Sequence, residues 1–236
     1  MRNQMVFKRY ELKYLLTKEQ EELIKQRMAD YMAGDEHGRN TIFSLYYDTP
    51  DFLLARRSME GPVYKEKLRL RSYGVANPDT EVFVEIKKKY KGIVYKRRIS
   101  MTKEESDRYL LYGEQVQDNQ ISREIDFLIK RYRGLAPRIL LSYEREAFYA
   151  KDNHEFRVTF DENILWRRED MDVEKGIYGE PILEDGMALM EVKTADSIPL
   201  WFADILSELK IYKTSFSKYG NAYKTICERE KRKLVG

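Results

Sequence analysis

The segment 64–74, YKEKLRLRSYG, carries a cation at every second position. Its alternating basic residues are Lys65, Lys67, Arg69 and Arg71. Successive side chains of a β-strand point to opposite faces, so the segment predicts a strand with four cations on one face. Like charges that lie directly opposite one another destabilise a sheet. A chain that folds with such a strand therefore needs counter-charges or an anionic ligand on that face.

Five other segments alternate in a similar way, with charged residues on one face and apolar residues on the other. They are 7–16, 81–89, 140–148, 154–162 and 189–195. A solvated face is the simpler explanation for any one strand, because antiparallel sheets often expose one face to water. Six such strands together favour a barrel with charged faces inside and apolar faces covered by amphipathic helices. Charges inside a barrel persist only with anions, carboxylates and water, and repeated phosphates suit both arginine and lysine.

The hydrophobic periodicity predicts about eight strands and five helices joined mostly by short connections. Strands are expected at 6–16, 40–47, 65–73, 81–89, 94–101, 138–149, 155–161 and 188–194. Helices are expected at 17–33, 102–112, 121–132, 197–209 and 221–233. The pattern predicts an α+β fold with a large antiparallel sheet or barrel. No linker, repeat or low-complexity tract interrupts the chain, so residues 1–236 are expected to form a single domain.

The composition suits a soluble globular protein: 42% of the residues are hydrophobic and 35% are charged. The net charge of +3 argues against a basic nucleic-acid coat protein, but residues 65–98 contain eleven Lys or Arg against four acids. The single cysteine, Cys227, and the absence of an apolar signal segment predict a cytoplasmic protein. No phosphate-binding glycine loop occurs, so side chains would have to hold the phosphates of a nucleotide.

Nine short motifs occur in order along the chain. They are RYELKY (9–14), SLYYDTPDF (44–52), KLRLRSYG (67–74), VEIKKK (84–89), YKRR (95–98), SYEREAF (142–148), FRVTFD (156–161), MEVK (190–193) and SFSKYG (215–220). Together they resemble the catalytic domain of the vacuolar transporter chaperone (VTC) family of polyphosphate polymerases, and the resemblance spans nearly the whole chain. It implies the fold of the triphosphate tunnel metalloenzymes, a closed eight-stranded antiparallel β tunnel barrel with a charged interior, flanked by helices.

The resemblance also implies roles for particular side chains. The basic residues that would bind the triphosphate and the growing polyphosphate are Lys13, Arg69, Arg71, Lys87, Lys96, Arg145 and Arg157. Further substrate contacts are implied for Tyr143, Lys193, Lys213, Ser217 and Lys218. Glu191 matches the glutamate that holds the family's divalent metal, Mn²⁺ or Mg²⁺. Glu11 and Glu85 either assist with the metal or pair with neighbouring cations, and the sequence favours the pairing.

The activity implied by the resemblance is transfer of the γ-phosphate of ATP to an inorganic polyphosphate chain, with release of ADP. Tunnel enzymes in general open with ExExK, whereas this chain has Arg9 in place of the first glutamate, which favours a polymerase over a triphosphatase. A triphosphatase that hydrolyses a nucleoside triphosphate or tripolyphosphate, and a non-catalytic polyphosphate-binding module, stay open as alternatives. No nucleic-acid partner is expected. If the product is exported, a separate membrane protein would do it and would place this chain at the inner face of the membrane.

Overall fold

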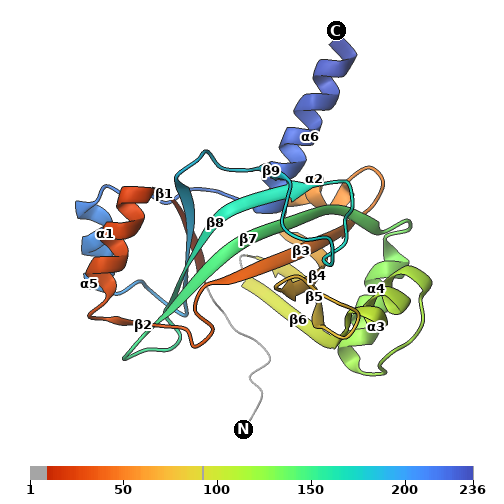
Figure 1. Ribbon diagram of the computed structural model, residues 1–236, viewed down its shortest axis with the longest axis horizontal. Helices are drawn as coiled ribbons and strands as arrows, with labels where there is room; N and C mark the ends of the chain where they lie inside the picture. Colours follow the sequence, from red (N-terminus) through yellow and green to blue (C-terminus); the bar gives the residue numbers. More distant parts are fainter. Residues whose placement is uncertain (1–9, 92, 236) are drawn as a thin grey trace. The chain divides into compact units, whose positions relative to one another are not determined.

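The computed structural model describes residues 10–91 and 93–235. Their strands are β1 (Tyr10–Thr17), β2 (Met32–Gly34), β3 (Asn40–Asp48), β4 (Tyr64–Tyr73), β5 (Glu81–Tyr90), β6 (Ile93–Thr102), β7 (Ala136–Ala150), β8 (Arg157–Arg167), β9 (Glu180–Pro181) and β10 (Met187–Thr194). Their helices are α1 (Lys18–Met28), α2 (Leu53–Met59), α3 (Lys103–Tyr112), α4 (Gln120–Arg131), α5 (Leu200–Glu208) and α6 (Lys218–Val235). The α+β class is thereby confirmed (Figure 1).

The predicted closed eight-stranded barrel is wrong. The described residues form a ten-stranded sheet whose neighbours follow the order β1-β10-β8-β7-β3-β4-β5-β6, with β2 paired to β7 and β9 paired to β8. Within the described part of the chain, β1 and β6 are the two ends of this order, so the sheet is open. Alternation along a strand shows which side chains share a face. It carries no information on whether the two outermost strands pair.

The chain divides into two compact units. Unit 1 consists of residues 1–41, 143–164 and 183–216, and unit 2 of residues 42–142, 165–182 and 217–236. The strands β3, β7 and β8 therefore each contribute residues to both units. The prediction of a single domain over residues 1–236 stays a prediction.

The main core of unit 2 lies between one face of β4–β6 and the helices α3 and α4. It contains alternate strand residues such as Leu68, Val84 and Ile99, packed with Tyr109 of α3 and Leu128 of α4. Figure 1 shows the two helices together beside this part of the sheet. Because residues of one parity are buried here, those of the other parity share the opposite face of the same strands. The predicted covering of the apolar face by amphipathic helices is confirmed in this unit.

Unit 1 repeats this arrangement with other elements. Its core joins Val158, Phe160 and Val192 on the strands to Ile24 of α1 and Phe202 of α5. The two helices lie side by side (Figure 1). A capping box begins α1, because the Thr17 hydroxyl accepts from the backbone of Gln20 and the Gln20 side chain accepts from the backbone of Thr17.

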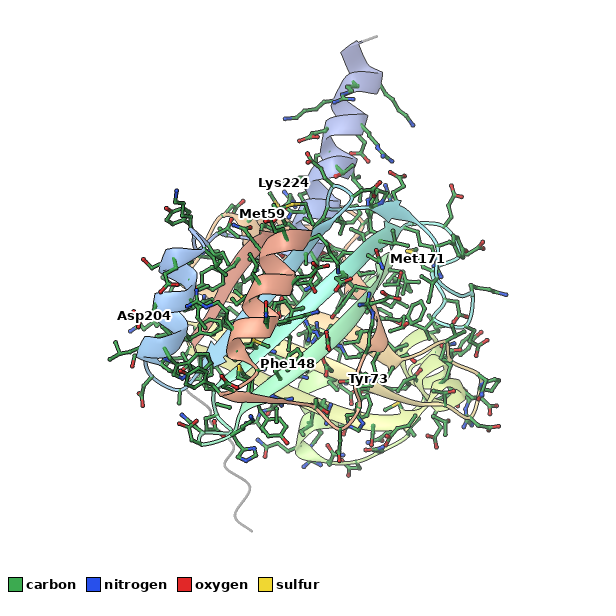
Figure 2. All side chains as sticks on the ribbon, turned by 60° about the vertical axis from the view of Figure 1, so that its left-hand side comes forward. Met59, Tyr73, Phe148, Met171, Asp204 and Lys224 are labelled. Atoms are coloured by element: carbon green, nitrogen blue, oxygen red, sulfur yellow. The ribbon has the colours of Figure 1, made fainter. Side chains whose placement is uncertain are left out.

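A second apolar cluster of unit 2 lies on the charged side of the strands. Tyr46 of β3 and Leu141 of β7 pack with Phe52, which precedes α2, and with Tyr219 of α6. The charged face of unit 2 is therefore partly covered by α2 and α6. Past this cluster the side chains of α6 are exposed from residue 228 to residue 233, as Figure 2 shows beyond the labelled Lys224.

Element boundaries differ from the predicted ones at a few places. The expected helix 17–33 ends at Met28 and is followed by β2, while α2 and β9 were not predicted. These three elements are short and leave little periodic signal. The first predicted strand, 6–16, begins outside the described residues and is seen from Tyr10. In the part of the chain that the structure describes, no helix is both long enough and apolar enough to cross a membrane.

Candidate functional site

Three lysines form a row across neighbouring strands on the charged face of unit 2. Lys67 of β4 lies opposite Lys87 of β5, and Lys87 lies opposite Lys96 of β6. Like charges at directly opposed positions repel one another. The row concentrates positive charge on this face, and an anion bound over it would be attracted by all three lysines. Lys88, the next residue along β5, belongs to the other face and pairs with Glu124 of α4 at 3.3 Å.

Glu85 is the central counter-charge of the adjacent row. Its carboxylate is completely buried and lies 2.6 Å from a terminal guanidinium nitrogen of Arg69 and 2.6 Å from the Lys96 ammonium. Burial raises the pKa of the Glu85 carboxyl, but Arg69, Arg71 and Lys96 outweigh burial and hold the pKa well below its usual range. Glu85 is therefore ionised and fixes two of the predicted phosphate-binding cations.

Lys96 and Arg71 complete the group around Glu85. Burial lowers the pKa of Lys96, Glu85 opposes that change, and the charges of Arg69 and Arg71 lower it further, to about 8. Arg71 is 6% exposed and donates to the Ser44 hydroxyl over 3.5 Å. One carboxylate thus serves several cations, so the group keeps a positive field available for an anion.

A pair of stacked tyrosines borders this cationic group. Tyr46 stacks on Tyr219 with ring centroids 4.3 Å apart, and its hydroxyl accepts from Arg69 over 3.2 Å. Burial raises the pKa of the Tyr46 phenol, but the charges of Arg69 and Lys67 lower it to about 7. The Tyr219 hydroxyl donates to the buried Asp48 over 2.6 Å. Burial, together with the Asp48 carboxylate, raises the pKa of Tyr219 above its usual range. The tyrosine pair is therefore fixed at one end by a carboxylate and at the other by cations.

Ser217, which directly precedes α6, and Lys218, its first residue, lie in the same part of unit 2. The Ser217 hydroxyl accepts from Lys67 over 3.4 Å and from the Gly220 backbone over 3.1 Å. Lys67 also lies over the Tyr219 ring, 5.5 Å from its centroid. Lys218 is 8% exposed. The structure thus joins Ser217, predicted as a substrate contact, to the lysine row.

In unit 1 the comparable face carries charges of both signs. Lys13 of β1 lies opposite Glu191 of β10, and its ammonium is 3.3 Å from Glu191 and 3.3 Å from Glu11. Arg145 of β7 forms a two-pronged ion pair with the buried Asp161 at 2.5 and 2.6 Å, and it lies 3.3 Å from Glu191. Three carboxylates and two cations are therefore interleaved.

Burial and ion pairing change the pKa of Arg145 in opposite directions. Burial lowers the pKa of its guanidinium, but Asp161, Tyr143 and Glu191 raise the pKa well above its usual range. Arg145 also lies over the Tyr143 ring, 5.3 Å from its centroid. Arg145 therefore stays charged at every accessible pH and can hold an anion without a proton change.

The remaining predicted residues of unit 1 lie around this group. Arg157 of β8 pairs with Asp35 at 2.8 Å and lies opposite Lys193 of β10. Lys213 is exposed and forms a bridge with β1 at Tyr14. Tyr143 is only 3% exposed. Thus Lys13, Tyr143, Arg145, Arg157, Glu191, Lys193 and Lys213 belong to unit 1, and Arg69, Arg71, Lys87, Lys96, Ser217 and Lys218 to unit 2. Arg9, the departure from ExExK, lies outside the described residues.

The carboxylates of unit 1 are the candidate ligands for the implied divalent metal. Across residues 10–91 and 93–235 there is no group of three or more His, Cys, Asp or Glu that could hold a metal ion. Glu11 and Glu191 nevertheless converge on one point, the Lys13 ammonium. Mg²⁺ commonly takes one or two carboxylates and completes its shell with phosphate oxygens and water. The donor set therefore fits a divalent cation that arrives together with phosphates.

Several side chains at these sites were not assigned a role from the sequence. Lys67 was recognised as part of the alternating segment, and the same alternation could have placed it in the predicted set. Asp161 is the last residue of the predicted strand 155–161, but its ion-pair partner Arg145 lies on another strand, so the sequence did not indicate the pair. Tyr46 and Asp48 occur in a motif that carries the family resemblance, and no local pattern indicates their contact with Tyr219.

Comparison with protein families gives a match over nearly the whole chain. The model of the VTC domain matches residues 8–227. No curated protein sequence matches this chain significantly.

Solved structures with a similar fold include three nucleotide-cyclase candidates. A proposed adenylate cyclase from Bacillus halodurans is 14% identical with a TM-score of 0.56, covering 90% of this chain and 94% of that chain. A proposed adenylyl cyclase from Hippeastrum, described as having a dominant triphosphatase activity, is 14% identical with a TM-score of 0.55, covering 89% and 92%. A proposed adenylate cyclase from Vibrio parahaemolyticus is 14% identical with a TM-score of 0.51, covering 93% and 99%. At this identity the similarity shows a common fold.

Proposed function

Because the chain belongs to the VTC domain family, we propose that it is a metal-dependent polyphosphate polymerase acting on triphosphates. It transfers the γ-phosphate of ATP to the end of an inorganic polyphosphate chain and releases ADP. The observation that carries this proposal is the row Lys67–Lys87–Lys96, three directly opposed cations on adjacent strands. A phosphate chain offers repeated anionic oxygens at a spacing that can neutralise such a row, which a single carboxylate or a neutral ligand would not do.

Unit 2 supplies the phosphate-binding part of the proposal. Arg69 presents a guanidinium that is held by Glu85 and Tyr46, so little side-chain entropy is lost when a phosphate binds. Lys87 and Lys96 add point charges that attract the same ligand. Phosphoryl transfer needs positioning and charge neutralisation rather than a protein nucleophile, and the residues of this face provide both.

Unit 1 has a charged group of its own, which contains the carboxylates proposed to hold the metal. Glu191 and Glu11 would hold Mn²⁺ or Mg²⁺, and that ion would neutralise phosphate oxygens when bound. The Lys13 ammonium lies 3.3 Å from each of these carboxylates, and it would contact the phosphates when the metal neutralises the carboxylates. Arg145, kept in orientation by Asp161, would hold another phosphate without any change in its own protonation.

A triphosphatase is the second candidate, favoured by the fold shared with the Hippeastrum protein that is described as having a dominant triphosphatase activity. In that reaction water replaces the polyphosphate end as the acceptor. The same cations would bind the triphosphate. The products distinguish the two reactions, because the hydrolase releases phosphate and the polymerase retains it in chains. In either reaction the chain would work in the cytoplasm, and export of a polymer would require a separate membrane protein.

The test is an incubation of the purified protein with ATP and MnCl₂, with phosphate chains separated on a gel and ADP and free phosphate quantified. Long chains formed together with ADP are expected for wild type. Lys87→Met should abolish them, because it removes the middle cation of the row. Lys88→Met is the matched control, because this neighbouring lysine lies on the other face of β5 and pairs with Glu124.

Three other results would change the assignment. Free phosphate without chains would establish the triphosphatase. Binding of polyphosphate without any turnover would establish a binding module. Equal loss of activity in the Lys87 and Lys88 variants would show that the row is not the substrate-binding surface.

A further inference from the structure

On the basis of the proposed function, we infer that Phe83, Tyr73 and Arg98 form the subsite for the nucleobase of the triphosphate. The nucleotide would lie along the strands of unit 2, with its base at this aromatic end and its terminal phosphate at the lysine row. The family match leaves this orientation of the substrate open.

The three side chains form a corner, a cluster of planar groups on the charged face. The rings of Tyr73 and Phe83 meet edge to face, with centroids 5.7 Å apart and an angle of 78°. The Arg98 guanidinium lies over the Phe83 ring, 4.4 Å from its centroid. Tyr73, labelled in Figure 2, is 45% exposed, and Arg98 is exposed as well. Aromatic rings and guanidinium planes are the surfaces on which bases stack in proteins.

The position of this corner matches the reach of a nucleotide. Phe83 and Lys87 have the same parity on β5, so both side chains lie on one face. Four residues of antiparallel strand separate them by roughly 14 Å, which is about the reach of an extended nucleoside triphosphate from base to terminal phosphate. Glu85, with its partners Arg69 and Lys96, lies between them. A nucleotide placed this way would set its inner phosphates over that cationic group.

Glu81 has the same parity on β5 as Phe83 and Lys87, so the end of this face beyond Phe83 carries a carboxylate. Glu81 and Ser100, which lies opposite Phe83, also line an open cavity of about 270 Å³ that reaches Met101 of the core and Glu105 of α3. Carboxylates repel phosphate groups and accept hydrogen bonds from the exocyclic amino group of adenine. The acidic end therefore favours the base and the basic end favours the phosphates, which fixes one of the two possible directions of binding.

The test compares two ligands that share a triphosphate and differ in the base. Dissociation constants for ATP and for inorganic tripolyphosphate are measured by isothermal titration calorimetry without divalent metal. Phe83→Leu keeps an apolar side chain but removes the ring, and Arg98→Lys keeps the charge but removes the plane. Each variant should bind ATP about 5- to 100-fold more weakly, the range expected for loss of one base-stacking contact. Binding of tripolyphosphate should change less than twofold.

A matched control and the thermal melting of each variant guard against a general loss of structure. Phe127→Ala removes an exposed ring from α4 and should leave both dissociation constants unchanged. Equal weakening of ATP and tripolyphosphate binding in the Phe83 and Arg98 variants, or no weakening of either, would overturn the base subsite and leave the proposed function intact. Failure of the wild-type protein to bind either ligand, also when MgCl₂ is present, would overturn both.

Discussion

Glu85→Gln should destabilise the ligand-free protein through the cations that Glu85 neutralises. The glutamate is fully buried, and its two ion-pair partners are fixed on neighbouring strands at 2.6 Å. Removing one member of a buried ion pair costs about 3–5 kcal/mol. The side chains left behind, Arg69 and Lys96, are 14% and 39% exposed, so water screens part of their charge. We therefore expect a loss of about 2–3 kcal/mol in the free energy of unfolding.

The assay is thermal unfolding followed by circular dichroism, with and without tripolyphosphate. At about 2–4 °C per kcal/mol for a chain of this size, the loss corresponds to a fall of roughly 5–10 °C in Tm. Tripolyphosphate should raise the Tm of the variant more than that of wild type, because the phosphates no longer compete with a carboxylate for the same cations. Glu124→Gln is the control: its side chain is 25% exposed and its pairs lie on the other face, so its loss should stay below about 1 kcal/mol. Equal losses in the two variants, or equal stabilisation of the variant and wild type by the ligand, would refute the reasoning.

Three further predictions concern pH and the support of α6. The pKa of Lys96 is about 8 in the ligand-free protein and higher in the unfolded chain, so the contribution of Lys96 to the free energy of unfolding rises as pH increases through 8. Loss of the Lys96 charge over the same range should weaken the binding of tripolyphosphate. In calorimetric titrations between pH 7 and 9, the affinity of Lys96→Arg for tripolyphosphate should fall less than that of wild type. The phenol of Tyr46 should ionise near pH 7 in ultraviolet absorption, and this transition should vanish in Tyr46→Phe. Tripolyphosphate should shift the midpoint of the transition to higher pH, because it neutralises the nearby cations, and an unshifted midpoint would contradict the prediction. Asp48→Asn should lower the free energy of unfolding by about 2–4 kcal/mol in urea titrations, because the buried carboxylate accepts hydrogen bonds from the backbone of Leu54 and Ala55 and from the Tyr219 hydroxyl. A loss under about 1 kcal/mol would show that these hydrogen bonds are dispensable.

The charged faces could be predicted because a strand has a period of two residues. Leu68 and Leu70 are buried in the core of unit 2, while Arg69 and Lys67 lie on the other face with the remaining cations. The capping boxes at Thr17 and Thr102 likewise mark the starts of α1 and α3. Such features depend on residues that are neighbours in the chain, so local chemistry is sufficient to find them.

The ion pair of Arg145 and the hydrogen bond of Asp48 could not be predicted, because each joins residues distant in the chain. Arg145 and Asp161 come from β7 and β8, and no local spacing relates them. Asp48 and Tyr219 are 171 positions apart, yet their hydrogen bond ties α6 to β3. Register between strands decides such partnerships, and register depends on the connections and packing of the whole unit.

The sequence by itself determined the α+β class, the charged and apolar sides of the strands, and the family resemblance that the VTC domain match supports. Only the tertiary structure decided that the sheet is open, that three lysines meet in one row, and that Arg69 and Lys96 are the cations with which Glu85 pairs. The physical reason is that alternation along a strand assigns a side chain to a face. Strand pairing and register then decide which charges on that face lie close enough to repel, to pair or to bind one anion together.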